Sequence, residues 1–138
     1  MKVKRNESTI NRPEGHRIID APFLFLDFPK FIRQLKKEKA WQENGRNGIT
    51  IFKSEELTMV VTILQEAGKI GNNQLNEYLI LQVINGRINV KTSQGVFKME
   101  KKQAMVFHPR LSHSIKALKK TALLLTTFNS MQGLGFKM

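Results

Sequence analysis

Short runs of apolar and β-branched residues, separated by turn-forming residues, fill most of the chain from residue 47 onward. These runs predict strands at residues 49–53, 57–65, 78–84, 87–92, 96–100, 104–107, 113–117 and 121–128. Asn85-Gly86 separates two of the runs, and this dipeptide between strands is a strong signal for a two-residue hairpin. Gly68 and Gly71 are expected to interrupt regular structure before residue 78. Many short strands joined by short turns predict an all-β fold, either an antiparallel barrel or a sandwich.

Two of the predicted strands are apolar on both faces. Residues 78–84 have apolar side chains at almost every position, and Leu123-Leu124-Leu125 repeats the pattern. A strand with one face in water should instead alternate between apolar and polar residues. We therefore expect one face to fill a barrel, and the other to be covered by a helix, by the N-terminal segment or by a second copy of the chain.

Residues 27–40 carry the clearest helical pattern. Asp27 is a suitable N-cap, and Pro29 falls in the first turn, where its missing N–H does no harm. Apolar side chains then recur at helical spacing, at Phe28, Phe31, Ile32 and Leu35. We predict one short α-helix here, which covers the barrel or a sheet.

Pro13, Gly15 and Pro22 punctuate residues 1–26, and no helical period appears there, so an extended N-terminal arm is predicted. Within it, residues 21–26 are rich enough in aromatic residues and leucine to form a strand. The predicted organisation is an arm at 1–26, a helix at 27–40, a barrel at 41–128 and a C-terminal tail at 129–138.

The composition is that of an ordinary globular domain, with 41% hydrophobic and 25% charged residues in a chain of 138. There is no cysteine, which excludes disulfides and thiol chemistry. No apolar run is long enough to span a bilayer, and residues 6–15, after the basic start, are polar. A cytoplasmic protein without a membrane span is expected.

The net charge is high and uneven. The chain has 23 Lys and Arg against 11 Asp and Glu, a formal charge of +12, and Glu100 is the only acidic residue after residue 77. Such a basic protein attracts polyanions or an acidic membrane surface at low salt. A solvated basic surface with no dedicated partner is the reading that the charge pattern favours.

Two stretches on either side of a predicted hairpin carry a family resemblance. Val83-Ile84-Asn85-Gly86 resembles the end of the first cupin motif, G-x5-H-x-H-x3,4-E-x6-G. Residues 102–113, with Phe107-His108-Pro109-Arg110-Leu111-Ser112-His113-Ser114, resemble the second, G-x5-P-x-G-x2-H-x3-N. The chain thus resembles a small single-domain bacterial cupin over about half its length. The resemblance implies a cupin-type double-stranded β-helix, or jelly-roll barrel, and together with the two-faced strands it predicts a homodimer.

In cupins, as the resemblance implies, three histidines and one glutamate hold a metal ion. Here Leu79 stands at the glutamate position, counting back seven residues from Gly86, and only His113 keeps its identity. The first two histidine positions are taken by other residue types for either loop length: Asn72 and Gln74, or Asn73 and Leu75. Neutral amides are poor ligands for transition metals compared with imidazole. We expect neither a metal nor another cofactor.

The sequence therefore predicts a degenerate cupin-like module that binds a small molecule or acts in regulation. A partly apolar pocket is expected, and Arg110 beside its mouth is placed to steer a carboxylate or phosphate. The candidate ligand-binding residues are Asn73, Gln74, Asn76, Glu77, Leu79, Leu81, His108, Arg110 and His113, with Val83, Met105 and Phe107 as further apolar wall.

Two alternatives from other classes stay open. The first is a metal-independent or atypical-metal isomerase or lyase, in which Glu77 and His113 act as acid and base on one substrate. The second is a basic binder of nucleic acid or of an anionic surface, with an affinity that falls steeply with salt. Binding a small molecule remains the favoured class.

Overall fold

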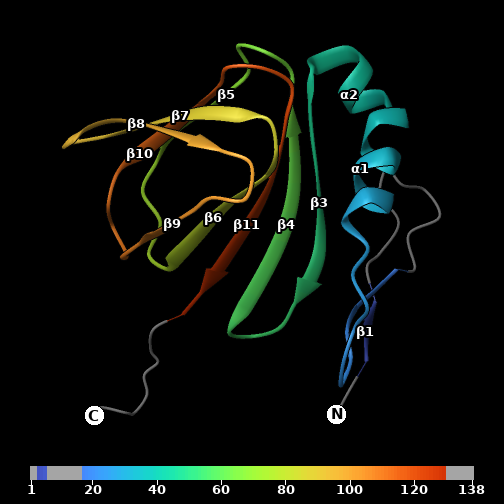
Figure 1. Ribbon diagram of the computed structural model, residues 1–138. Helices are drawn as coiled ribbons and strands as arrows, with labels where there is room; N and C mark the ends of the chain where they lie inside the picture. Colours follow the sequence, from blue (N-terminus) through green and yellow to red (C-terminus); the bar gives the residue numbers. More distant parts are fainter. Residues whose placement is uncertain (1–2, 6–16, 130–138) are drawn as a thin grey trace, which may run out of the picture.

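The computed structural model describes residues 3–5 and 17–129, and there the chain forms two facing β-sheets with helices on one side (Figure 1). Half of the predicted N-terminal arm, at residues 1–2 and 6–16, and nearly all of the predicted tail at 129–138 lie outside the described residues. Within them no helix is long and apolar enough to cross a bilayer.

All strand pairs are antiparallel, and the two larger sheets form a jelly roll, which confirms the fold class predicted from the sequence. The five-stranded sheet contains, in spatial order, β3 (Arg46–Lys53), β4 (Leu57–Leu64), β11 (Thr121–Phe128), β6 (Tyr78–Asn85) and β9 (Ala104–Phe107). The four-stranded sheet contains β5 (Lys69–Asn73), β10 (His113–Ala117), β7 (Arg87–Thr92) and β8 (Gly95–Glu100). A separate ribbon pairs β1 (Lys4–Arg5) with β2 (Ile18–Asp20).

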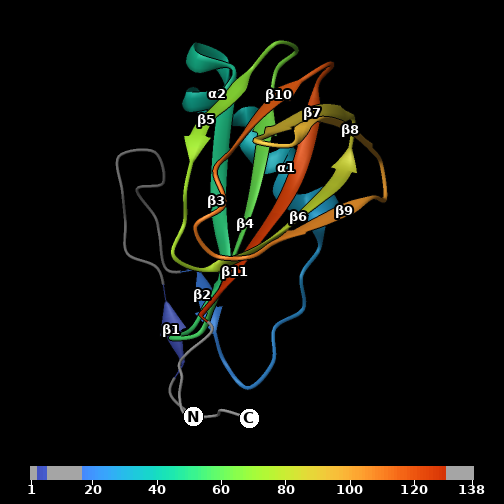
Figure 2. The same ribbon diagram turned by 90° about the vertical axis from the view of Figure 1, so that its left-hand side faces the viewer.

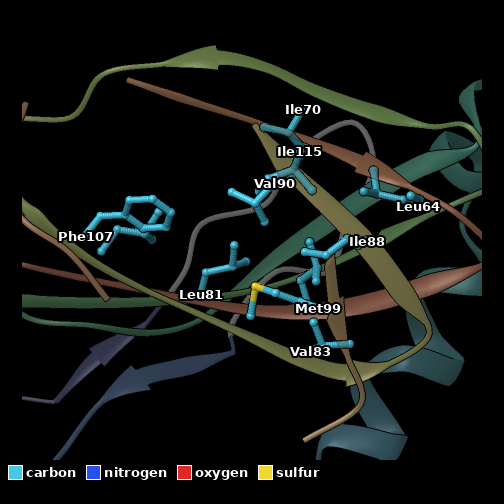
Figure 3. Close-up of a cluster of buried hydrophobic side chains, with 12 residues drawn as sticks. Leu64, Ile70, Leu81, Val83, Ile88, Val90, Met99, Phe107 and Ile115 are labelled. Carbon is cyan, nitrogen blue, oxygen red and sulfur yellow. The ribbon is translucent and has the colours of Figure 1, made fainter. Parts of the chain in front are cut away.

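The inner core fills the space between the two larger sheets. Figure 3 shows Leu81 and Val83 from β6 facing Val90 and Ile88 from β7 across this space. Alternate residues of each strand point inward, because successive side chains of a strand project to opposite faces. The buried members of this core are Leu64, Ile70, Leu79, Leu81, Val83, Ile88, Val90, Met99, Phe107, Ile115, Ala117 and Leu123.

A second core lies on the outer face of the five-stranded sheet. Helices α1 (Phe28–Lys37) and α2 (Lys39–Asn44) cover that face (Figure 1). The buried residues there are Ile32, Leu35, Trp41, Ile49, Ile51, Val61, Ile63, Ala122 and Leu124. This outer layer explains why Leu123 and Leu124 are both apolar: one lies in the inner core, and the other lies under the helices.

Helix α1 begins and ends with specific side-chain contacts. The Asp27 side chain accepts a hydrogen bond from the Lys30 N–H at 3.2 Å, which confirms Asp27 as the N-cap. At the other end, the buried Asn47 side chain donates to the Leu35 carbonyl at 3.0 Å and to the Glu38 carboxylate at 2.9 Å. The Leu35 carbonyl also accepts from the Glu38 N–H at 3.3 Å, so Asn47 adds a second hydrogen bond to the helix end and fixes α1 against β3.

The helical region differs from the single helix predicted over residues 27–40. The backbone is extended at Glu38, and a second helix, α2, follows and ends at Gly45 in the left-handed conformation. The break turns the chain so that Trp41 is buried against the outer face of the sheet. Periodicity alone did not show this break, because the apolar positions of α1 stop before it.

Two strand predictions were also wrong. Residues 21–26 do not form a strand; the adjacent Ile18–Asp20 pairs with β1 instead, and Phe23 and Phe25 project into solvent. Conversely, β5 forms despite Gly71, because it pairs with β10. The register of β5 against β10 shifts by one residue in this region, as expected for a bulge beside a glycine.

Candidate functional site

A cavity of about 330 Å³ lies between the two sheets, where the ends of several strands meet. It takes residues from β3, β4, β6 and β11 of one sheet and from β5 and β10 of the other. Its lining consists of Arg46, Val60, Thr62, Ile70, Asn73, Leu75, Leu79, His113, Ile115, Leu125 and Thr127. This is the volume of a small-molecule site, and it joins the inner core below.

Apolar and polar side chains divide the lining. Six of the residues are aliphatic, and five carry a polar group that a ligand could meet: Arg46, Thr62, Asn73, His113 and Thr127. No aspartate or glutamate lines the cavity. The arrangement suits a partly apolar molecule that is neutral or negatively charged at its polar end.

His113 is held firmly at the start of β10. Its side chain is only 3% exposed, and its ring stacks on Phe107 with centroids 4.7 Å apart and an interplanar angle of 21°. Its Nδ1 lies 3.4 Å from the carbonyl oxygen of Leu111. A carbonyl only accepts hydrogen bonds, so this contact requires a proton on Nδ1 and leaves Nε2 to accept from a ligand when the ring is neutral.

Arg46 closes the side of the cavity between the two sheets. It stands at the start of β3, and one of its terminal nitrogens donates to the backbone carbonyl of Lys69 on β5 at 3.2 Å. This bond connects the outermost strands of the two sheets. A guanidinium has five N–H donors, so most of its donors remain for a bound anion.

Of the nine ligand-binding candidates, three line this cavity: Asn73, Leu79 and His113. Leu81 lies beneath it, fully buried in the inner core. The other five, which do not line it, are Gln74, Asn76, Glu77, His108 and Arg110.

Two surface loops hold most of those five residues. The Gln74 side chain donates to the Arg110 carbonyl at 2.9 Å, and the Arg110 N–H donates to the Leu75 carbonyl at 2.6 Å. These bonds fix the two loops to each other at the rim, so Gln74 is engaged with backbone. His108 is exposed and lies against Tyr78, at 5.0 Å between ring centroids.

Eight lining residues were not predicted as ligand-binding from the sequence: Arg46, Val60, Thr62, Ile70, Leu75, Ile115, Leu125 and Thr127. A signal for two of them was present. Thr62 and Thr127 point inward, because Thr62 lies on the same face of β4 as the core residue Leu64, and Thr127 lies on the same face of β11 as the core residue Leu123. A hydroxyl at a position that should be apolar marks the place where a barrel interior meets a polar cavity.

The residues at the cavity do not fit the three-histidine, one-glutamate metal site that the sequence resemblance implies. The lining offers one imidazole, one amide, two hydroxyls and the positive charge of Arg46. Elsewhere in the described part of the chain, no group of three or more His, Cys, Asp or Glu residues lies close enough together to hold an ion. The positive charge of Arg46 would repel a metal ion, and the single imidazole of His113 is too few ligands to hold one.

No protein-family model matches the chain, and no curated protein is detectably similar in sequence. Solved structures do resemble it. The cupin domain of Cnp3 from Schizosaccharomyces pombe is 14% identical, with a TM-score of 0.60, and the match covers 94% of this chain and 89% of that one. A conserved protein of unknown function from Streptococcus pyogenes is 16% identical, with 80% and 90% covered and a TM-score of 0.60. A cupin-superfamily protein from Desulfitobacterium hafniense is 9% identical, with 62% and 79% covered and a TM-score of 0.60.

Proposed function

We propose that this chain, which has the cupin fold, is a metal-independent binding or regulatory module for a small, partly apolar carboxylate. The observation that carries the proposal is the cavity lining: an aliphatic wall with Arg46 and His113, and no carboxylate among the lining residues. A carboxylate would accept charge-assisted hydrogen bonds from the arginine, and its apolar part would pack on the wall.

The size and shape of the cavity support a molecule of modest size. About 330 Å³ lies near the lower end of the range for small-molecule sites. Leu79 occupies the position where the cupin motif has its glutamate, and Leu125 lines the cavity from the neighbouring β11. Both side chains place apolar surface where an ion site would need donor atoms.

The catalytic alternative, with Glu77 and His113 as an acid and base pair, has less support. Of these two residues only His113 lines the cavity. A general acid and a general base must both reach the same bound substrate. We therefore favour binding over catalysis for this site.

We expect phenylacetate to raise the thermal midpoint of the protein more than phenylacetamide, which has the same shape without the charge. Arg46→Gln should weaken phenylacetate binding by about tenfold or more, since a hydrogen bond to a charged group contributes roughly 1.5–3 kcal/mol. It should change phenylacetamide binding little. Titration calorimetry of both probes, with and without EDTA, measures these effects alongside elemental analysis of the purified protein.

Lys69→Gln is the matched control, because it removes the same charge from the strand beside Arg46 but faces away from this cavity. It should leave phenylacetate affinity unchanged. Stoichiometric metal, or a response abolished by EDTA, would contradict metal-independent binding. Equal affinity for the acid and the amide would contradict recognition of a carboxylate.

We also propose that two copies of the chain associate through their exposed apolar segments. Phe23 and Phe25 are 86% and 92% exposed in the segment that connects β2 to α1. On another part of the chain, a groove of about 240 Å³ is lined by Phe97, Val106 and Leu111, which are also exposed apolar residues. An exposed aromatic segment and an apolar groove match in chemistry, because each would remove the other's apolar surface from water.

The area involved is sufficient for a specific dimer. A phenylalanine buries about 150–250 Å², so the four from two copies would bury about 800 Å². A similar area from the two grooves brings the total to about 1,600 Å², the standard size of a specific interface.

The double variant Phe23→Ser/Phe25→Ser is expected to raise the dimer dissociation constant at least a hundredfold, because burying each phenylalanine contributes about 1.5–3 kcal/mol. Sedimentation over a range of protein concentrations measures this change. Added salt should strengthen the dimer, since both copies carry a charge of +12. A variant that sediments like the parent protein would exclude this interface, and Val106→Ser/Leu111→Ser tests the groove from the other side.

A further inference from the structure

The outer face of the four-stranded sheet is a ladder of lysines. Lys69 on β5 lies directly opposite Lys116 on β10, and Lys116 in turn opposes Asn89 on β7, which opposes Lys98 on β8. Lys91 occupies the next outward position of β7. Side chains two residues apart on a strand share a face, so these four lysines project to the same side of the sheet.

The charge on this face is unbalanced. Like charges directly opposite each other on neighbouring strands are destabilising, and Lys69 and Lys116 are such a pair. The acidic residue on these four strands, Glu100, pairs with Arg87 at 3.2 Å. Among the described residues, none of the four lysines forms an ion pair. The lysines of this face therefore repel one another, and a bound polyanion would neutralise that repulsion.

The face is also hollowed into a groove. One depression of about 320 Å³ is lined by Lys69, Lys116, Asn89 and Lys91 among others, and a second of about 500 Å³ adjoins it. They share Lys91 and Ser114, so they form one continuous groove. The second depression adds hydroxyl groups from Ser93 and Ser112, and it is also lined by Thr92, whose hydroxyl donates to the Gly95 carbonyl at 3.3 Å.

Nothing in the described part of the chain lies over this groove. The helices cover the opposite, five-stranded sheet, and Figure 2 shows the four-stranded sheet in front with the helices behind it. The groove and the cavity between the sheets share Ile70 and Ile115 in their linings, but none of the groove lysines lines the cavity. The two surfaces can therefore be tested separately.

We propose that this lysine groove binds the phosphate backbone of a nucleic acid without reading its sequence. Lysine ammonium, serine and threonine hydroxyl and asparagine amide groups are donors that commonly contact phosphate oxygens. None of the residues lining the two depressions is aromatic, so bases have no platform on which to stack. Val96 is the one large exposed apolar side chain that lines the groove. Insertion into a membrane would need more apolar surface than this, so the groove favours a polyanion.

The proposal predicts a specific salt dependence. Each lysine that neutralises a duplex phosphate contributes about −0.9 to the slope of log affinity against log salt. The three lysines that line the groove and Lys98, which lies opposite the groove residue Asn89, would together give a slope of about −3.6. Affinity for a fluorescein-labelled 20-base-pair duplex should then fall on the order of a hundredfold between 50 and 200 mM KCl. Fluorescence anisotropy measures this slope, and a 20-nucleotide single strand should give a slightly smaller value.

The decisive comparison uses two double variants with the same net charge. Lys91→Gln/Lys116→Gln removes two charges from the groove, whereas Lys36→Gln/Lys37→Gln removes two exposed charges from α1. We expect the groove variant to lose at least tenfold in affinity at 100 mM KCl and to lower the slope by about 1.8. The α1 variant should lose less than about threefold. The thermal midpoint of the groove variant should not fall, because the repulsion between Lys69 and Lys116 is relieved.

Three results would overturn the proposal. The first is an equal loss of affinity in the two variants, which would mean that net charge alone drives binding. The second is no duplex binding at 50 mM KCl. The third is lysine-dependent binding to vesicles containing 30% phosphatidylserine in the absence of duplex binding, which would identify the face as a membrane contact.

Discussion

Replacing Gly86 by alanine is expected to destabilise the protein by about 3–5 kcal/mol, from backbone strain and overpacking together. Gly86 has a φ of +100° in the turn where the chain passes from β6 of one sheet to β7 of the other, a conformation that L side chains rarely adopt. An added Cβ would also lie 2.3 Å from the Thr121 hydroxyl and 2.6 Å from the Lys120 carbonyl.

The crowding has a structural cause. Thr121 is buried at the start of β11, and its hydroxyl accepts from the Arg87 N–H at 3.2 Å and lies 2.7 Å from the Lys119 carbonyl, to which it donates. The turn before β7 and the turn before β11 are therefore in direct contact. A side chain at Gly86 would push these two turns apart. The chain passes from the five-stranded to the four-stranded sheet at this turn.

Urea unfolding of two other glycine variants separates strain from crowding. Gly95 has a φ of +134° but nothing within 4 Å of an added Cβ, so Gly95→Ala should show the cost of strain alone, about 1–3 kcal/mol. Gly71 has neither constraint, and Gly71→Ala should be neutral or slightly stabilising. A Gly86→Ala protein no less stable than Gly95→Ala would show that the corner can relax, against this prediction.

Leu35→Ala is expected to lower the free energy of unfolding by about 2–5 kcal/mol, the range for truncating a fully buried leucine. Leu35 is completely buried beneath α1 and packs in the outer layer with Ile49, Ile51 and Val61 of β3 and β4. Its carbonyl also accepts the Asn47 hydrogen bond that fixes the end of the helix. The alanine variant would leave a cavity between α1 and the sheet.

The volume-conserving variant Leu35→Met is the control and should cost less than about 1.5 kcal/mol. Urea unfolding followed by circular dichroism in the far-ultraviolet region measures both. If the helices and the barrel form one cooperative unit, the alanine variant keeps a single transition with a lower midpoint. A fully stable barrel with only α1 lost would show that the outer layer does not support the fold.

Many strand positions could be predicted from the sequence, because turn residues and the alternation of apolar and polar side chains are local signals. The predicted bounds of β7, β9, β10 and β11 match the structure. Asn85-Gly86 does form a turn, but the predicted hairpin is wrong, because β6 and β7 belong to different sheets and do not pair. The failures came from long-range causes. Trp41 belongs to a second helix because the sheet face offers it a buried position, and β5 survives Gly71 because β10 supplies its hydrogen bonds.

The cavity was less predictable, for a geometric reason. Alternation shows which side chains point inward, but not how far along the barrel the core ends and open space begins. Asn73 and His113 were found because the motif resemblance placed them, and the structure pairs them directly across β5 and β10. Arg46 lies almost thirty residues before Asn73 and meets the site only where β3 approaches β5, a contact that no local pattern encodes.

The two aromatic residues that occur once each lie in different layers of the molecule. Trp41 is buried among the helices, whereas Tyr78 stacks on Phe128 at 5.0 Å, next to the cavity residue Leu79. Intrinsic emission therefore separates two regions without any label: the indole reports on the helical layer, and the phenol on the rim. A change in indole emission when a ligand is added would accordingly indicate a movement transmitted through the five-stranded sheet, not contact with the chromophore.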